Sequence, residues 1–526
     1  MPLLPERPNI EHLKKQAKDL LRDYEAGDAA SFTRLRNSLP AAEGKTNSEI
    51  AALGLKLHDA QSCIAREYGL PSWRNLKNYV DWRNMMMSHA REDAVPRWLH
   101  YVYGHETDPP KPQLAARTLE ERPDLGQGDL FLACASGDAA AIERAIAAGR
   151  ECVNQLTDYW RCPGCKETLD MPPLVAVTHS TLLQLPAYKD SFRRCARLLL
   201  DAGADPNQFW MHGEHPLSAL YGAAGKNHDS ALTMMLLDAG ANPNDGESLY
   251  HSLETPDHTC TRLLLERGAK LQVWTVLAHQ LDRDDIEGLR LLLRYAGKSS
   301  TTDLEQCLFW AIRRRRDRAH VEALIAAGAN PRAINKEGVS AWRLALQYGL
   351  TAAAEALEAA GGSESLSLED RFVAACARCD ELEARRILEA ESGVFGRLSE
   401  FQLRQLPELV ENRNTNAVKL MVRLGWPINV PGGDWKASAL NLAVFQGDSD
   451  LTRFLLEHGA SWTERHGFGD NVNGTLSWAS RNRDPECGDW VGCARALVEH
   501  GMPADLESRY SDEVAEFFAA ERAKSG

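Results

Sequence analysis

The chain has 526 residues, of which 44% are hydrophobic and 25% charged, and its formal net charge is -14. This length exceeds what one hydrophobic core serves, and the ordinary composition excludes wholesale disorder, so several domains or a repeat array are expected. The acidic balance repels phosphate groups and therefore disfavours nucleic acid and anionic membrane surfaces as partners.

The N-terminal sequence MPLLPERPNIEHLKKQAKDLL lacks the apolar core of a secretory signal. No apolar run approaches the length of about 18 residues that a membrane span requires. The 12 cysteines are scattered through the chain, not concentrated as in small disulfide-stabilised domains. The sequence therefore predicts a cytoplasmic protein with reduced thiols and no membrane partner.

Residues 1–83 are predicted to form an N-terminal helical domain. LKKQAKDLL and CIAREYGL have helical periodicity, and the sequence GLPS from Gly69 to Ser72 supplies a helix stop followed by an N-cap. This domain either caps a following solenoid or serves as a separate docking module. Residues 84–127, which contain DPPKP, are predicted to be a linker with short helices.

From residue 128 onward one pattern recurs: an apolar run, two or three variable residues, and a glycine that is often followed by alanine. The run predicts the buried stripe of a helix, and the glycine predicts its left-handed C-terminal cap. In the Asp-Pro-Asn that often follows, proline fixes one backbone angle and asparagine tolerates the left-handed region. A short Ala-rich helix precedes each run. The terminal glycines are Gly149, Gly203, Gly240, Gly268, Gly297, Gly328, Gly361, Gly425, Gly459 and Gly501.

This pattern resembles the ankyrin repeat, whose period is roughly 33 residues and whose first helix opens with T-P-L-H-x-A. HPLSAL, PPLVAV, ESLYHS and SALNLA stand at the corresponding places here. The family spacing of about nineteen residues from the motif's leucine to the glycine is met, for example, by Leu440 and Gly459. The resemblance implies an all-α fold, an ankyrin-repeat α-solenoid. We expect a first block of repeats over residues 128–362 and a second over 363–526 that ends in a capping helix.

The chain also resembles a bacterial group of ankyrin-repeat proteins that begin with a helical segment. The likeness covers nearly all of the chain and is carried by PNIEHLKKQAKDLLRDYEAGD, AREYGLPSWRNLK and YGAAGKNHDSALTMMLLDAGANPNDGESLYHSLE. It implies no settled biochemical activity. Three repeats exceed the family spacing through STLLQLPAYKD, GAAGKNHD and RDPECGDW, and such insertions map to loops or extended helices that often lie near a binding face.

The sequence CPGC places Cys162 and Cys165 in an inserted loop after the first repeat. Thiolates at this spacing can bind one zinc ion, with Cys152 or His179 as further candidate ligands. A closed site needs four ligands, and no second cysteine pair lies at a suitable distance in sequence. The alternatives are two free thiols or a redox-labile pair.

A second constellation joins the sequence Asn227-His228-Asp229 to Asp245, Glu247, Tyr250 and His251 of the next repeat. Glu247 and His251 are one helical turn apart, and these groups together could coordinate a metal or act as an acid–base pair. The alternative is that they make the hydrogen bonds between repeats.

Five arginines, at positions 313–316 and 318, surround a predicted helix end. They could grip an acidic partner or a phosphate. The alternative is a solvated turn between two helices.

The 13 tryptophans form the fourth group of candidates. Trp210, Trp274, Trp310, Trp435 and Trp462 fall at or near turns and first helices, which line the concave face of an ankyrin solenoid. Tryptophan is the residue most enriched in interface hot spots. Together with Tyr221 and the constellation around His251, these tryptophans are the predicted partner-binding residues.

The sequence therefore predicts an interaction scaffold that binds a protein partner on the concave face of a solenoid. No nucleophile elbow, P-loop or His-Glu-x-x-His motif supports catalysis, so we expect no enzyme and no cofactor other than zinc at Cys162 and Cys165. The alternative function is a small-molecule or metal site, with or without enzymatic activity, around His228, Asp245, Glu247 and His251.

Overall fold

A computed structural model describes residues 4, 8–86, 90–104, 109–156, 169–297, 301–484 and 487–525. These residues form an all-α solenoid, as predicted, to which one two-stranded hairpin is added. The chain divides into two compact units, Met1–Ala269 (unit 1) and Lys270–Gly526 (unit 2). The predicted boundaries at residues 83, 127 and 362 stay predictions.

Unit 1 begins with a group of helices that precede the repeats. Tyr24 ties this group together, because its hydroxyl donates to the carbonyls of Ile50 and Ala51, at 3.1 Å each. Arg117 of α7 donates to the carbonyl of Gly69 at 2.9 Å and so joins the group to the following helices. The elements are α1 (Ile10–Glu25), α2 (Ala29–Ser38), η1 (Pro40–Ala42), α3 (Asn47–Ala51), α4 (Leu57–Glu67), α5 (Trp73–Met86), α6 (Arg91–Tyr103), α7 (Pro112–Glu121) and η2 (Pro123–Gly126).

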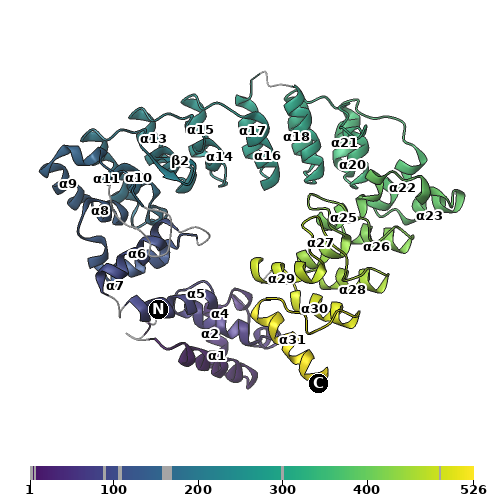
Figure 1. Ribbon diagram of the computed structural model, residues 1–526, viewed down its shortest axis with the longest axis horizontal. Helices are drawn as coiled ribbons and strands as arrows, with labels where there is room; N and C mark the ends of the chain where they lie inside the picture. The colour runs from purple at the N-terminus through teal and green to yellow at the C-terminus, as the bar shows by residue number, and fades with distance from the viewer. Residues whose placement is uncertain are drawn as a thin grey trace. The chain divides into compact units, whose positions relative to one another are not determined.

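Four helix pairs follow in unit 1, and α6 and α7 pack beside the first of them. Each pair has a first helix that contacts the next first helix and a second helix behind it (Figure 1). The elements are α8 (Leu130–Ser136), α9 (Ala139–Ala148), η3 (Arg150–Asn154), α10 (Pro173–His179), η4 (Thr181–Gln184), α11 (Lys189–Asp201), β1 (Phe209–His212), β2 (His215–Ser218), α12 (Ala219–Tyr221), η5 (Gly222–Lys226), α13 (Ser230–Asp238), α14 (Ser248–Ser252) and α15 (Thr259–Glu266).

Unit 2 continues the same arrangement and ends with α31, whose Val514 and Phe518 are buried against the last pair. The elements are α16 (Val273–Arg283), α17 (Ile286–Tyr295), α18 (Thr301–Arg313), α19 (Arg318–Ala326), α20 (Ala341–Gln347), α21 (Thr351–Ala359), α22 (Leu368–Ala377), α23 (Glu381–Ala390), η6 (Val394–Arg397), α24 (Glu400–Leu403), α25 (Gln405–Glu411), α26 (Thr415–Arg423), α27 (Ala439–Gln446), α28 (Ser449–Glu457), α29 (Val472–Asn482), α30 (Trp490–Glu499) and α31 (Asp512–Ser525).

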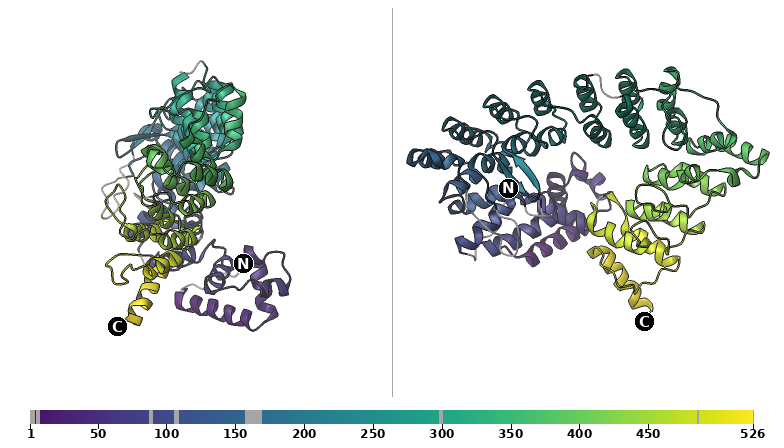
Figure 2. Two further views of the ribbon diagram at one scale, coloured as in Figure 1. Left: turned by 90° about the vertical axis from the view of Figure 1, so that its right-hand side faces the viewer. Right: turned by 45° about the horizontal axis from the view of Figure 1, so that its top comes forward.

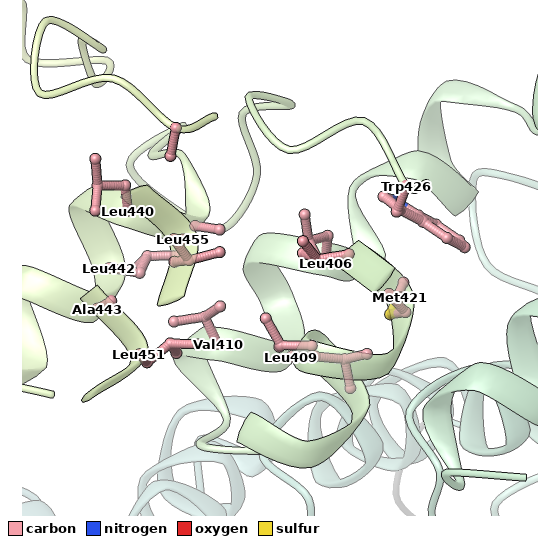
Figure 3. Packing of buried hydrophobic residues seen from close by; sticks show 14 of the residues in the cluster. Leu406, Leu409, Val410, Met421, Trp426, Leu440, Leu442, Ala443, Leu451 and Leu455 are labelled. Carbon is pink, nitrogen blue, oxygen red and sulfur yellow. The ribbon is translucent and has the colours of Figure 1, made fainter. Parts of the chain in front are cut away.

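The core of each unit is built from the apolar faces of neighbouring pairs. In Figure 3, Leu406, Leu409 and Val410 of α25 pack among Met421 of α26 and Leu451 of α28, and all five are at most 1% exposed. Burial of one such side chain contributes roughly 1.5–3 kcal/mol, so a pair without neighbours would leave most of this free energy unrealised.

Aspartate starts most of the second helices. Its side chain accepts a hydrogen bond from the backbone N–H three residues later, which satisfies one of the free donors at a helix N-terminus. The aspartates in this position are Asp138, Asp229, Asp285, Asp317, Asp380, Asp448 and Asp489.

The glycines that end the second helices have positive φ angles, as the repeat pattern predicts, with the exception of Gly149. Gly149 has φ 179°, which is extended backbone, and the chain enters η3 directly after it. The asparagines after these glycines were expected to tolerate a left-handed backbone, but none has a positive φ. Instead, Asn154 and Asn207 donate to the carbonyls of Gly203 and Gly240 in the next repeat, at 2.9 and 3.3 Å.

The third repeat departs most from the others. Its entry forms the antiparallel hairpin β1–β2, in which Phe209 pairs with Ser218 and His212 with His215 (Figure 2). The sequence GAAGKNHD was expected to be an insertion, and the structure shows that Gly222–Lys226 extends α12 as a π-helical turn. A π-helical turn carries one extra residue per turn, which accommodates the added length without a loop.

Two glycines that flank α20 give a matched test of the packing. Both have left-handed φ angles, 70° at Gly349 and 74° at Gly338. A Cβ atom at Gly349 would lie 2.5 Å from the carbonyl oxygen of Ala377 in the next first helix, whereas nothing lies within 4 Å of one at Gly338. We expect Gly338→Ala to cost about 1 kcal/mol of unfolding free energy and Gly349→Ala about 3 kcal/mol, because only the latter forces two first helices apart. The midpoints of urea denaturation, followed by circular dichroism, measure both. Equal midpoints would contradict the close approach.

Candidate partner-binding surfaces

In unit 1, aromatic and imidazole rings from three successive repeats form a continuous row. His179 of α10 lies 5.6 Å from Tyr221 of α12, and Tyr221 lies 5.3 Å from His251 of α14, measured between ring centroids. Tyr250 extends the row at 5.1 Å from His251. On the other side, Trp210 of β1 lies 6.5 Å from His179. The structure therefore brings together four of the predicted partner-binding residues: Trp210, Tyr221, Tyr250 and His251.

His179 is the buried centre of this row. Its Nδ1 donates to the carbonyl of Val175 at 3.1 Å, since a carbonyl can only accept. Burial, and then the positive charge of Lys226, lower the pKa of His179 to about 3. The imidazole is therefore neutral at physiological pH and acts as part of the packing.

Most of the polar groups predicted around His228 bind neighbouring repeats. The side-chain amide of Asn227 donates to the carbonyls of Thr178 and Ser180, at 2.7 and 3.2 Å. The buried carboxylate of Asp229 accepts two hydrogen bonds from the guanidinium of Arg193, at 3.1 and 2.8 Å. These groups point toward the preceding repeat and hold two helix pairs together.

Asp245 also has a structural role. One carboxylate oxygen accepts from the hydroxyl of Ser218, and the other accepts from the backbone N–H of Ser248 at 2.9 Å. Asp245 therefore holds the turn before α14 and links it to the hairpin. The interpretation as hydrogen bonds between repeats accounts for Asn227, Asp229 and Asp245.

Glu247 and His251 do form the predicted pair, with 3.3 Å between the carboxylate and Nε2. Glu254 contacts the other ring nitrogen, Nδ1, at 3.0 Å. His228 has φ 49° and occupies the turn between η5 and α13, the place that Gly137 and Gly349 take in other repeats. Across the described ranges, no group of three or more His, Cys, Asp or Glu side chains could hold a metal ion. The metal alternative at His228, Asp245, Glu247 and His251 is therefore not supported, and Cys162 and Cys165 lie outside the described residues.

Four of the five arginines at and after the end of α18 pair with carboxylates of this chain. Arg314 contacts Asp282 at 2.7 Å, Arg316 contacts Asp284 at 2.5 Å, and Arg318 contacts Glu322 at 2.6 Å. Arg313 contacts Asp434 at 3.3 Å. The ion pairs of Arg313, Arg314 and Arg316 join different repeats, and that of Arg318 lies within α19. All four favour a structural role over phosphate binding.

A cavity in unit 2 opens where α18, α20 and α25 meet the turn before α27. It encloses about 300 Å³, open solvent included. We call it the acidic cavity, and its lining residues are Trp310, Arg313, Arg314, Tyr348, Glu408, Glu411, Asn412 and Asp434.

Glu408 is the most buried carboxylate of the acidic cavity, at 9% exposure, and it accepts a hydrogen bond from the hydroxyl of Tyr348. Burial raises the pKa of Glu408 and that of Glu411 above the usual range for glutamate. Burial also raises the pKa of Tyr348, and the charge of Glu408 adds to that effect. The tyrosine is therefore a hydrogen-bond donor, and Glu408 is buried while Glu411 is half-buried.

A second surface of unit 2 combines two exposed aromatic rings with three half-buried ones. Trp435 lies 5.2 Å from Phe445 of α27, and Phe445 stacks on Trp478 of α29 with 5.7 Å between centroids and 16° between planes. His466 lies 5.0 Å from Trp435 and 5.9 Å from Phe468. We call Trp435, Phe445, His466, Phe468 and Trp478 the aromatic platform. Trp478 is 51% exposed and Phe468 is 82% exposed.

Arg483 adds a cation to this platform, because its guanidinium lies 4.6 Å above the ring of Phe445. Sequence reasoning found only Trp435 of this group. The pattern that could have indicated the others is an aromatic residue in the first helix of a repeat, or in the turn before it. It occurs in the sequences NLAVFQ, RHGFGD and TLSWAS.

The other predicted tryptophans occupy different environments. Trp274 is 36% exposed and meets Trp310 edge to face at 5.9 Å. The indole N–H of Trp310 donates to Asp282 at 2.9 Å. Trp210 is only 9% exposed, and Trp462 is half-buried against the core of the last repeats. Trp210 and Trp462 therefore offer little surface to a partner.

No family model matches the sequence, and no curated protein matches it. Among solved structures, the ankyrin repeat domain of Bcl-3, described as a unique member of the IkappaB protein family, has 19% identity and a TM-score of 0.22 over 46% of this chain and 97% of that chain. The human ASB11 ankyrin repeat domain has 16% identity and a TM-score of 0.21 over 43% and 98%. Scores this low carry no argument, so the repeat type rests on the helix pairs and glycine turns of this chain. No helix within the described ranges has both the length and the apolar character to cross a membrane.

The buried imidazole of His179 predicts a pH dependence of stability. Its pKa is about 3 in the folded chain and about 6.5 when unfolded, so only the unfolded chain binds this proton between these values. Stability is therefore lost as pH falls below 6.5. We expect this group to remove about 2 kcal/mol between pH 7 and pH 5. In His179→Gln the fall in melting temperature over that pH range should be smaller than in the parent, and in the exposed His12→Gln it should be unchanged. Parallel pH profiles for parent and His179→Gln would contradict the prediction.

Proposed function

We propose that this protein is a scaffold that binds a protein partner on the side formed by its first helices and turns, the predicted concave face. The observation that carries this proposal is the aromatic platform of unit 2. Two of its large aromatic rings, those of Trp478 and Phe468, are exposed, and exposed apolar patches mark interaction sites. Trp478 and Phe468 have the exposure and the chemistry of hot-spot residues.

Support also comes from how the rings are held. Phe445 and Trp478 belong to α27 and α29, which pack on each other, while Trp435 lies in the turn that leads into α27. Side chains fixed on packed helices lose little conformational entropy when a partner binds. Binding rather than catalysis is the role we propose, and the cytoplasmic location stays a prediction.

The test uses the full-length chain, immobilised and exposed to increasing amounts of lysate from its native cells. We expect saturable capture of a partner by the parent. Trp478→Ser should weaken that capture about 30-fold, because loss of a hot-spot tryptophan costs at least about 2 kcal/mol of binding free energy. Quantitative mass spectrometry of the captured proteins gives the binding curve.

The control is Leu382→Ser on α23, a second helix. Leu382 is 85% exposed, so the substitution removes a comparable exposed apolar side chain outside the proposed surface. Capture should be unaffected. Equal capture by Trp478→Ser and Leu382→Ser, or no saturable partner of the parent, would sink the proposal.

A further inference from the structure

Arg483 is a cation that the fold holds in place without pairing it to a carboxylate. Its guanidinium lies 4.6 Å from the ring centroid of Phe445, and this contact fixes the side chain against the aromatic platform. Its terminal nitrogens, Nη1 and Nη2, are not buried, and within the described residues they meet no acceptor and no carboxylate. Both nitrogens can therefore donate to an acceptor from outside the chain.

The same phenyl ring joins this cation to an exposed tryptophan. Phe445 of α27 stacks on Trp478 of α29, with 5.7 Å between ring centroids, and these two first helices pack on each other (Figure 1). Trp478 is 51% exposed. A hydrogen-bonding cation and an exposed indole thus lie against one ring, where a single short segment of a partner can contact both.

The basic residues of the platform segments lack carboxylate partners. Four of them stand within five positions of a platform residue: Lys436, Arg465, Arg481 and Arg483. In the part of the chain that the structure describes, none of the four forms an ion pair. Arg465 and Arg481 donate only to backbone carbonyls, those of Gly469 and Ser477. The side chain of Lys436, like that of Arg483, makes no hydrogen bond to a described residue.

The acidic residues of the same segments already have partners within the chain. Asp434 contacts Arg313 at 3.3 Å. Glu464 and Asp470 accept hydrogen bonds from backbone N–H groups at 2.8 and 2.9 Å, and Asp484 also interacts within the chain. The polar groups that a partner finds without a counter-charge are therefore positive, and carboxylates complement them.

We propose that the aromatic platform binds a segment of the partner protein in which an aspartate or glutamate stands two residues from an aromatic or large aliphatic residue. This inference rests on the proposed function and names the chemistry of the partner. The carboxylate accepts charge-assisted hydrogen bonds from Arg483, and the apolar side chain covers Trp478. In an extended segment, side chains two residues apart point to the same side and lie about 7 Å apart, which suits two contacts that share the ring of Phe445.

A single-stranded nucleic acid also combines negative charge with rings that stack on aromatic side chains. The observations favour a polypeptide for two reasons. The net charge of the chain is -14, which repels a continuous line of phosphates. The carboxylates of Asp434 and Asp470 also lie in the turns that carry Trp435 and His466, so a strand that follows these turns would meet negative charge.

The test measures binding of fluorescently labelled probes to the full-length protein by fluorescence anisotropy. The first probe is the peptide Asp-Glu-Ser-Phe-Glu-Asp, for which we expect a dissociation constant of about 0.1 mM. Asn-Gln-Ser-Phe-Gln-Asn has the same shape without the charges, and Asp-Glu-Ser-Ser-Glu-Asp has the charges without the ring. Both should bind at least tenfold more weakly, as should a single-stranded oligothymidine of about 12 nucleotides.

Two variants assign the contacts. Arg483→Gln should weaken the first peptide about tenfold and leave the uncharged peptide unaffected, because only the first loses a charge-assisted hydrogen bond. Trp478→Ser should also weaken the first peptide about tenfold.

Arg423→Gln is the matched control. Arg423 of α26 lies 5.6 Å from the ring of Phe454, so it too is an arginine held over a phenylalanine. The ring of Phe454 contacts His458 and, within the described ranges, no tryptophan. This variant should bind the first peptide as the parent does. Circular dichroism verifies that each variant is folded.

The inference is overturned if the first peptide does not bind, or if the uncharged peptide, the peptide without a ring or the oligothymidine binds as tightly. It is also overturned if Arg483→Gln or Trp478→Ser binds the first peptide as the parent does. Failure of the proposed function gives a different result, namely partner capture that does not depend on Trp478. Capture that depends on Trp478, together with equal binding of the charged and uncharged peptides, would remove only this inference.

Discussion

The structure depends on the fact that one helix pair cannot bury its own apolar faces, so every pair must stack on a neighbour. A polar group buried between two helix pairs then needs a hydrogen-bond partner on the neighbouring pair. An unpaired buried polar group costs more free energy of folding than a hydrogen bond contributes. Asp370 shows how this is met. Its carboxylate, 4% exposed, accepts from Gln347 of the preceding repeat at 3.0 Å and from Gln402 at 2.9 Å.

The same requirement separates groups that serve the fold from groups that are available to a ligand. Asp229 and Asp245 looked like site residues in the sequence, yet Arg193 and two serines occupy their carboxylates. Glu411 has no such partner, and Arg483 contacts only the face of Phe445 within the described residues. The two sets contain the same chemical types of side chain. They differ in whether another residue of the chain already pairs with the group, and this depends on which side chains the stacking of repeats brings together.

Much of the fold could be predicted because its signal is local and periodic. Most of the glycines that end second helices recur near the 33-residue period, and each repeat buries its apolar face in the same way. The site could not be predicted in the same way. Tyr348 and Glu408 are 60 residues apart in sequence, and their contact arises only because intervening repeats bring α20 and α25 together. The π-helical turn after α12 likewise depends on packing, as do the side-chain hydrogen bonds of Asn207. Packing of this kind produces no periodic pattern in the sequence.

The acidic cavity and the aromatic platform share a thermodynamic property that sets them apart from the rest of unit 2. Burial of Glu408 raises its pKa, which means that its charged form is disfavoured there, and an apolar side chain of similar size would serve the fold at least as well. Phe468, at 82% exposure, gains almost nothing from burial in the free chain. Some side chains lower the stability of a fold, or add nothing to it, where another residue would stabilise it more. Such side chains are expected at functional sites rather than in the scaffold.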